Sequence, residues 1–428
     1  MGALIKANLL FIQLILNSVL GLLFQREAAR LFSISVEKSI FDIAFTFPFG
    51  ILEALGLTFL HTILVAHFIK KDSQIQHAQI FYTTILLILI TVSPLALVIY
   101  YYSNEIATFL APGMDIIQTE TLSQCLKILL PILIIMPLSY VLTARQQGNG
   151  DPVGQEFLLM ISRFITIGYL SVSSHAHDIL DFCYLVTYTI LIAFLIQLIL
   201  HIPFFLNSTI KINKNEISII FVNVSQFVVL GALAQISATY SRSLLTTADP
   251  KLVSVWMYSL YLVEPIGNIF GRVVAFTTGI PLGKESSLQA SINMQRLMKY
   301  FAQINLVTIP FIAFVFYYLD TIIGTVFGES VFTKDDLNLL KTSVYILMPS
   351  VVFSIFKWLM IYPITMSFKG SVLLAFAPGF VIQIIALHFM SDEITLINVA
   401  SVYVLTLIIQ CVCGAILLSS FARISKEN

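Results

Sequence analysis

The chain has 428 residues, of which 58% are hydrophobic and 11% are charged, and its mean hydropathy is +0.93. Soluble globular domains carry about 25% charged residues, so this composition excludes a soluble globule. Lysine plus arginine equals aspartate plus glutamate at 23 each, so no net charge favours nucleic acid or another polyanion as a partner.

The elements in chain order are long apolar segments. A spanning helix needs about 20 mostly apolar residues. We expect the first segment to be retained as a span, because no small-residue cleavage site follows it. The segments therefore predict an all-α polytopic membrane protein without room for a separate soluble domain. The twelve candidate spans lie at approximately 8–32, 41–69, 79–102, 123–144, 155–174, 182–206, 217–245, 253–281, 298–319, 341–364, 370–390 and 395–420.

The basic residues of the short connections predict the orientation. Lysine and arginine gather in alternate connections, such as Lys70 with Lys71 and Lys211 with Lys214, whereas the connections at 103–122, 175–181 and 391–394 contain neither. Because cytoplasmic loops carry the excess of basic residues, we expect both termini to be cytoplasmic.

A Pro-x-Gly pattern occurs in the second segment and returns about half the chain later in the eighth. A carboxylate lies within a turn or two of each copy, Glu53 in the first and Glu264 in the second. Interrupted helices at matching places in two halves indicate a transport cavity near the bilayer midplane. The predicted helix-breaking residues are Pro48, Gly50, Pro265 and Gly267.

A second landmark supports an internal repeat. Pro131 in the fourth segment and Pro349 in the tenth have nearly the same separation as the two Pro-x-Gly copies. We therefore predict two six-helix lobes of the same topology, residues 1–210 and 211–428, around a central cavity and related by an axis along the membrane normal.

Charged residues within the spans mark candidate sites, because an ionised group at the bilayer centre costs about 2.5–3.5 kcal/mol. The candidates are Arg26, Asp42, Glu53, Lys127, Arg163, Arg242, Glu264, Arg272 and Lys357. Two simpler interpretations remain open. Lys127, Arg163 and Arg242 lie near segment ends, from which they could reach the interface. Asp42 is expected to cap the second helix.

Glu53, Glu264, Arg272 and Lys357 lie deeper in their spans, and we expect them to face the cavity. Arginine and lysine at depth suit a phosphate or diphosphate. The carboxylates would hold the cations or couple to an ion. No nucleotide-binding or metalloprotease motif occurs, and the four cysteines have no ligand spacing. We therefore expect no cofactor and no metal, and coupling to the membrane potential, Na⁺ or H⁺ is left open.

Several stretches, in order along nearly the whole chain, resemble the MurJ/MviN-like lipid II flippases of the multidrug/oligosaccharidyl-lipid/polysaccharide (MOP) exporter superfamily. Ser18 to Phe32 is similar to that family's first helix, and Lys357 falls at its tenth-helix lysine. The other similar stretches are 44–48 (AFTFP), 110–114 (LAPGM), 126–131 (LKILLP), 255–281 and 331–336 (VFTKDD).

The departures from the family pattern concern the cavity arginines. The family places arginines on its first, second and eighth helices, and among these positions only Arg26 is basic here. Ser18, the Leu52 and Glu53 pair and the stretch 260–262 occupy the others. By position, Arg272 is our candidate substitute. The family also carries two further helices beyond the twelve found here.

The resemblance implies a flippase in the inner (plasma) membrane of a bacterial cell. It would move a polyprenyl-diphosphate-linked saccharide, such as lipid II, from the cytoplasmic to the outer leaflet by alternating access for cell-wall synthesis. In that scheme Arg26, Arg272 and Lys357 bind the anion, and envelope-synthesis proteins are candidate partners. The alternatives are a flippase for another lipid-linked oligosaccharide, a small-molecule or cation antiporter of the same superfamily, and a non-transporting partner protein. No paired catalytic constellation occurs, so an enzyme is not expected.

Overall fold

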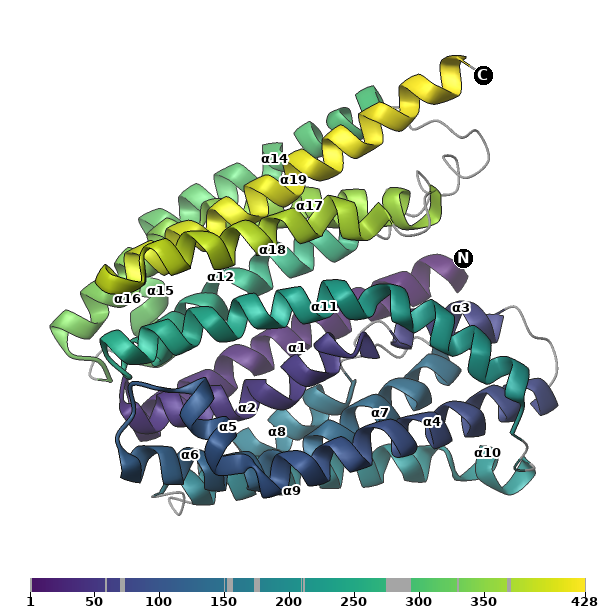
Figure 1. Cartoon of the computed structure of the whole chain (residues 1–428), viewed down its shortest axis with the longest axis horizontal. Coiled ribbons are helices and arrows are strands. Elements are labelled where there is room, and N and C mark those ends of the chain that lie inside the picture. Colours follow the sequence, from purple (N-terminus) through teal and green to yellow (C-terminus); the bar gives the residue numbers. More distant parts are fainter. Residues whose placement is uncertain are drawn as a thin grey trace. The chain divides into compact units, whose positions relative to one another are not determined.

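The computed structural model describes residues 2–57, 60–69, 74–149, 151, 157–172, 178–208, 210, 212–274, 294–328, 331–367 and 371–427. Within these ranges the regular structure is helical and no strand occurs (Figure 1). This confirms the predicted all-α class. The chain divides into two compact units, Met1–Ile236 and Ser237–Asn428, and each is described separately.

The N-terminal unit consists of long helices joined by short connections. Its helices are α1 (Gly2–Phe32), α2 (Val36–Ala54), α3 (Leu60–Ile69), α4 (Gln74–Tyr101), α5 (Ser103–Leu110), α6 (Ile116–Leu129), α7 (Pro131–Gly148), α8 (Phe157–Val172), α9 (Ile179–Leu200), α10 (Ile202–Asn207) and the first part of α11 (Lys214–Ala248).

The C-terminal unit begins within α11, which runs across the division between the units. The lobe boundary expected at residues 210 and 211 lies just before this helix and remains a prediction. The further elements are α12 (Leu252–Val274), α14 (Met294–Tyr317), α15 (Leu319–Phe327), α16 (Lys334–Leu347), α17 (Pro349–Ser367), α18 (Ser371–Phe389), the short 3-10 helix η3 (Ser391–Glu393) and α19 (Leu396–Glu427).

In its described residues, each of the twelve predicted spans coincides with one helix or with two consecutive helices; residues 275–281 of the eighth span lie outside the described part. Seven stretches in the described part are long and apolar enough to cross a membrane on their own. Prolines divide two of the spans: Pro131 begins α7 and Pro349 begins α17. Proline suits this first helical position, because the N–H that it lacks would have no partner within the helix.

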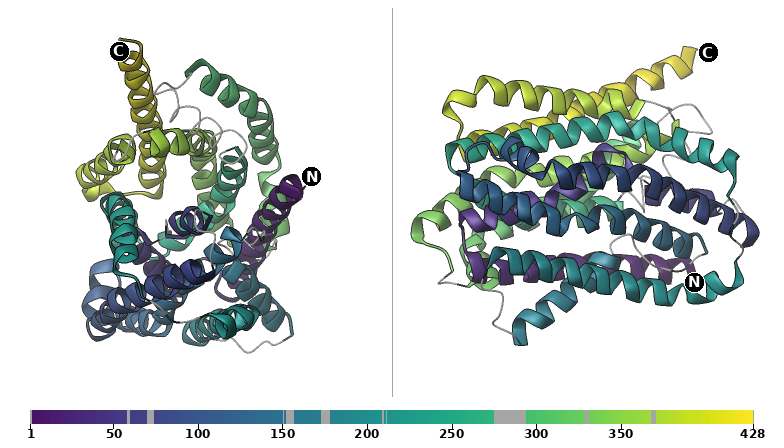
Figure 2. Two further views of the ribbon diagram at one scale, coloured as in Figure 1. Left: turned by 90° about the vertical axis from the view of Figure 1, so that its right-hand side faces the viewer. Right: turned by 60° about the horizontal axis from the view of Figure 1, so that its bottom comes forward.

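The repeat is visible in the element order of the two units. In each, a long helix is followed by a short helix, α5 with 8 residues or α15 with 9. A 14-residue helix comes next, α6 or α16, and then the helix that begins with proline. The helices of each unit run alongside one another in the views of Figure 2, as expected for membrane bundles.

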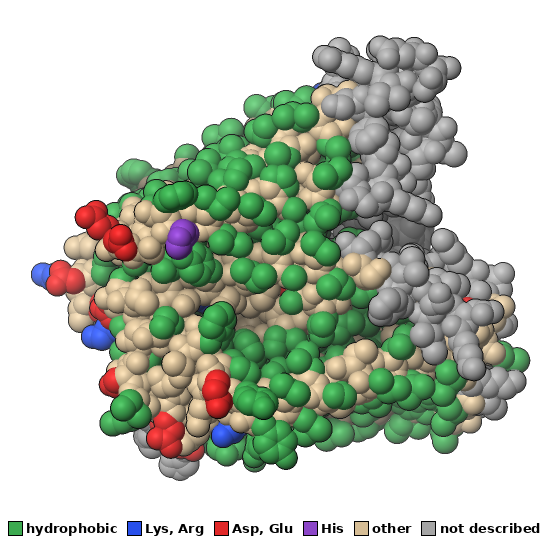
Figure 3. All heavy atoms as spheres, in the orientation of Figure 1, with side chains coloured by type: hydrophobic (Ala, Val, Ile, Leu, Met, Phe, Trp, Pro, Cys, Tyr) green, Lys and Arg blue, Asp and Glu red, His purple; other side chains and the backbone are tan. Residues whose placement is uncertain are grey.

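Aromatic rings from α1, α2 and α9 form a core in the N-terminal unit. The Phe41 ring lies 4.8 Å from that of Phe182 and 5.3 Å from that of Phe45, and Phe24 stacks on Phe182 at 5.8 Å. The face of the molecule drawn in Figure 3 is largely hydrophobic. Such a surface fits lipid contact, since hydrocarbon cannot solvate polar groups.

Candidate functional site

Helix α1 carries Arg26, one of the predicted site residues. Its side chain is exposed, and within the described part of the chain it has no hydrogen-bond or ion-pair partner. Arg30, one turn later, makes contacts that stabilise the fold. It forms an ion pair with Glu27 at 3.0 Å and donates a hydrogen bond to the Leu170 carbonyl oxygen at 3.3 Å. That oxygen lies in the last turn of α8, where a positive charge favours the helix dipole.

Arg163 of α8 reaches back to α1. It donates to the backbone oxygen of Asn17 at 3.1 Å and to its side-chain oxygen at 2.8 Å. A Cβ on Gly21 would lie 3.2 Å from the same guanidinium nitrogen, so Gly21 leaves room for this arginine. Arg30 and Arg163 together fasten α8 to α1 at two levels. Arg163 is therefore a structural link between helices, and not a side chain that extends to the interface.

The other two candidates near segment ends also have neighbours. The Lys127 ammonium lies 5.6 Å from the centre of the Tyr100 ring, within cation–π range. Arg242 is 9% exposed, and its Nε donates to the Ala238 carbonyl oxygen at 3.2 Å.

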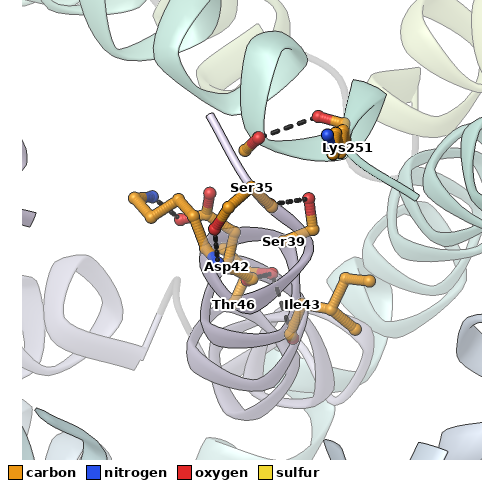
Figure 4. A network of polar contacts seen from close by, with 8 residues as sticks. Ser35, Ser39, Asp42, Ile43, Thr46 and Lys251 are labelled. Atoms are coloured by element: carbon orange, nitrogen blue, oxygen red, sulfur yellow. Dashed lines mark hydrogen bonds and ion pairs between the residues drawn. The ribbon is translucent and has the colours of Figure 1, made fainter. Parts of the chain in front are cut away.

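Asp42 does not cap α2, so that prediction was wrong. The N-cap is Ser35, whose hydroxyl accepts from the backbone N–H of Lys38 (Figure 4). The helix thus begins earlier than its apolar run, and Asp42 falls in its second turn. There it accepts a hydrogen bond from the Lys38 ammonium at 2.5 Å, and both side chains are 0% exposed. The i, i+4 spacing on one helix face brings the two charges together.

Helix α2 is not interrupted at Pro48 and Gly50, as the sequence suggested, but continues to Ala54. A membrane helix can accommodate the N–H that proline lacks. The chain turns instead at Leu55 and Gly56, and Gly56 has a φ of +68°, the left-handed conformation that glycine commonly supplies just beyond a helix end. Glu53, half-buried, lies in the last turn before this break.

The end of α2 packs closely against α11 within the N-terminal unit. A Cβ on Gly231 would come 1.8 Å from the Glu53 carbonyl oxygen, and one on Gly50 would come 2.0 Å from the Gln235 side chain. Gly50, the glycine of the first Pro-x-Gly pattern, therefore allows α2 and α11 to approach closely. Nearby, His67 of α3 and Glu216 of α11 approach to 2.5 Å, a pair that the sequence analysis did not identify.

Helix α12 likewise continues through Pro265 and Gly267, to Val274, so the predicted break there is also corrected. Gly267 and Gly271 form a G-x-x-x-G pattern that faces α17. A Cβ on Gly267 would meet the Ser354 side chain at 3.2 Å, and one on Gly271 would meet Trp358 at 2.4 Å. Small residues at this spacing let membrane helices approach closely.

Three of the predicted site residues belong to the C-terminal unit. Glu264 is exposed, and its Oε1 accepts a hydrogen bond from the Tyr403 hydroxyl at 2.9 Å. Lys357, half-buried on α17, has its ammonium 5.6 Å from the Phe376 ring and 5.9 Å from the Phe380 ring. Arg272 lies in the last turn of α12, but its side chain is outside the described residues.

No group of three or more histidine, cysteine or acidic side chains able to hold a metal ion occurs in the described part of the chain. All four cysteines are free; Cys125, Cys183 and Cys411 are buried and Cys413 is half-buried. The predicted site residues that the structure describes are charged side chains on α1, α2, α12 and α17.

Comparisons with known proteins define the family. The family model of lipid II flippase MurJ matches residues 28–362. A search of curated proteins found no match. A MurJ lipid II flippase in an inward closed conformation is similar in structure, with a TM-score of 0.79 and 14% identity, covering 99% of this chain and 90% of that one.

Other members of the MOP superfamily share the fold. An inward-facing MATE-family multidrug resistance transporter has a TM-score of 0.75 and 12% identity, covering 96% of each chain. A MOP transporter from Pyrococcus furiosus, described as having a binding pocket of reversed polarity, has a TM-score of 0.67 and 12% identity, covering 98% of this chain and 95% of that one. Since the family model matches more than half of the sequence, the chain belongs to the MurJ lipid II flippase family.

Proposed function

We propose that this protein is a flippase that moves a polyprenyl-diphosphate-linked saccharide, such as lipid II, from the cytoplasmic to the outer leaflet. The match to the MurJ family model over residues 28–362 carries the reaction class. The family is one of transporters, and the protein is accordingly a multi-pass membrane protein of the bacterial inner membrane.

The observation that supports a diphosphate as the substrate group is a difference in the contacts made by the arginines of α1 and α8. Arg30 and Arg163 are held by carbonyl and carboxylate oxygens, whereas Arg26 is exposed and without a described partner. A guanidinium presents paired N–H donors that match a phosphate, and its charge is permanent. Arg26 is therefore the residue of α1 that is available to a diphosphate.

Outward movement of such an anion needs no nucleotide. A membrane potential that is negative inside favours export by about 2.3 kcal/mol per charge per 100 mV. In our proposal the two lobes, residues 1–210 and 211–428, rock against each other, and both termini lie in the cytoplasm. Arg272 and Lys357 supply further positive charge, Glu53 balances charge in the N-terminal lobe, and envelope-synthesis proteins are the expected partners.

The proposal is tested by binding of the purified full-length protein to lipid II and to undecaprenyl diphosphate. Arg26→Ala is compared with Arg30→Ala, which removes the same charge one turn away but from a side chain used in the fold. We expect Arg26→Ala to weaken binding at least tenfold. Arg30→Ala should keep most of the affinity and instead lower the unfolding temperature in detergent.

Two results would count against the proposal. If the wild-type protein binds neither lipid, the substrate class is wrong. If both variants weaken binding equally, Arg26 has no special role.

A further inference from the structure

We propose that Glu264 is a proton-binding site that controls how strongly the C-terminal unit attracts an anion. When ionised, Glu264 offsets part of the positive charge of Lys357; when protonated, it no longer does so, and the C-terminal unit attracts a phosphate-bearing headgroup more strongly. This inference rests on the proposed function, because it assigns a step of that transport cycle to Glu264.

The first observation is the hydrogen bond from Tyr403. Its hydroxyl donates to Oε1 of Glu264 at 2.9 Å, and its ring packs edge-on against Trp256 with the centroids 5.6 Å apart. Trp256 is two turns before Glu264 on α12 and is buried. The donor is thus held in place by a rigid aromatic contact. Since a hydroxyl can donate to either a carboxylate or a carbonyl oxygen, the bond persists when a proton binds Oε2.

The second observation is the register of α12 against α17. Asn268, one turn beyond Glu264, accepts a hydrogen bond from the Trp358 indole at 3.3 Å. The close approach of Gly267 to Ser354 and of Gly271 to Trp358 fixes the same register. Lys357 lies between Ser354 and Trp358 in sequence, so its backbone is held beside the segment of α12 that follows Glu264. This register brings Lys357 into the neighbourhood of Glu264.

The side chains around the Lys357 ammonium stabilise its positive charge. Two ring faces, Phe376 and Phe380, lie one helical turn apart on α18 and flank the ammonium at 5.6 and 5.9 Å. Aromatic rings stabilise a cation without neutralising it. The protonation state of Glu264 therefore determines the net charge of the pair.

Few other titratable groups lie on α16, α17 and α19, the helices with the most extensive contacts to α12. Helix α14 also touches α12, through the rings of Phe311 and Phe270, and its charged residues, Arg296 and Lys299, lie near its start. On α17, Lys357 is the charged residue. On α16, the charges are confined to the first eight residues, where Lys341 pairs with Asp320 at 2.6 Å. The described side chains of α19 add Tyr403 and two thiols, and Arg272 on α12 is outside the described part. The remaining groups of α16 are Lys334, Asp335, Asp336 and Tyr345.

A proton fits this site better than a metal cation. Calcium takes six to eight oxygen ligands and magnesium requires a near-octahedral shell. The described groups at Glu264 comprise one carboxylate, one phenol and one ammonium, and the ammonium would repel a metal ion. A single carboxylate with a fixed donor can take up and release one proton.

The test measures binding of undecaprenyl diphosphate to the full-length protein from mildly acidic to mildly alkaline pH. We expect wild-type affinity to fall as pH rises, by a factor within the range of about 5 to 150 that is typical of coupled sites. Glu264→Gln, which mimics the protonated form, should bind tightly at every pH. Arg26→Ala should bind more weakly at every pH but keep the pH dependence.

Tyr403→Phe serves as the matched control. It removes only the hydroxyl that stabilises the carboxylate, so the midpoint of the pH dependence should move to higher pH while the amplitude is unchanged. Glu264→Gln with the same pH dependence as the wild type would overturn the proposal.

A second measurement is independent of the lipid. Infrared difference spectra of the ligand-free protein between low and high pH should contain a carboxylic acid band that is lost in Glu264→Gln and shifted in midpoint by Lys357→Met. Absence of that band would refute proton binding. A wild-type protein that shows the band but binds no undecaprenyl diphosphate would instead refute the proposed substrate and the proton-controlled anion binding, and leave the proton site in place.

Discussion

Removing one partner of the Lys38–Asp42 pair should destabilise the protein more than removing both. The two side chains are 0% exposed, and their charged atoms are 2.5 Å apart. The Lys38 ammonium also lies 5.6 Å from the centre of the Phe41 ring, in the aromatic core of the N-terminal unit. Water therefore cannot replace a lost partner, and Asp42→Ala would leave a buried ammonium without its carboxylate.

Breaking a buried ion pair costs about 3–5 kcal/mol, whereas replacing both charges by apolar groups of similar volume is often neutral or stabilising. We expect the unfolding temperature in detergent to fall markedly in Asp42→Ala. The double variant Lys38→Met with Asp42→Leu should regain most of the loss. Circular dichroism of the four proteins, the two single variants, the double variant and wild type, makes the comparison. A double variant as unstable as the worse single variant would refute the reasoning.

Two further predictions concern helix contacts in the N-terminal unit. Gly231→Ala should lower thermal stability strongly, since its Cβ would lie 1.8 Å from the backbone oxygen of Glu53. The control, Gly168→Ala, has nothing within 4 Å of its Cβ and should be neutral or raise stability by up to about 1 kcal/mol. Equal effects of the two substitutions would contradict the packing of α2 on α11. Arg163→Ala should cost about 1–3 kcal/mol, because the Asn17 oxygens lose their donor, while affinity for undecaprenyl diphosphate stays within twofold at a temperature where the variant is folded. Unchanged stability in Arg163→Ala would show that this link between α1 and α8 is dispensable.

Hydropathy and proline placement predicted most of the fold. In their described residues the twelve apolar segments coincide with one helix or two consecutive helices, and the two prolines used as landmarks of the repeat, Pro131 and Pro349, each begin a helix. The Pro-x-Gly motifs misled, because a proline inside a membrane helix removes one hydrogen bond without ending the helix. The actual turn, at Gly56, depends on a left-handed backbone conformation, which the letter G alone does not reveal.

The site was predicted less completely, since hydropathy reports depth in the bilayer but not the direction a side chain takes. Arg26, Arg30 and Arg163 are the same residue type. What distinguishes Arg30 and Arg163 from Arg26 is that they make contacts between α1 and α8. Tyr403 could not be identified, because its partner Glu264 is distant in sequence. The i, i+4 spacing of Lys38 and Asp42 could have predicted their ion pair, but Asp42 was interpreted as a helix cap instead.

The most direct test of the central claim is transport itself. Full-length protein in liposomes should move a fluorescent undecaprenyl-diphosphate-linked saccharide between leaflets, at a rate that rises with an applied potential favouring anion export. Arg26→Ala should lose at least nine-tenths of that rate while Arg30→Ala keeps most of it at a temperature where it is folded. A wild-type rate equal to that of protein-free liposomes would contradict the account.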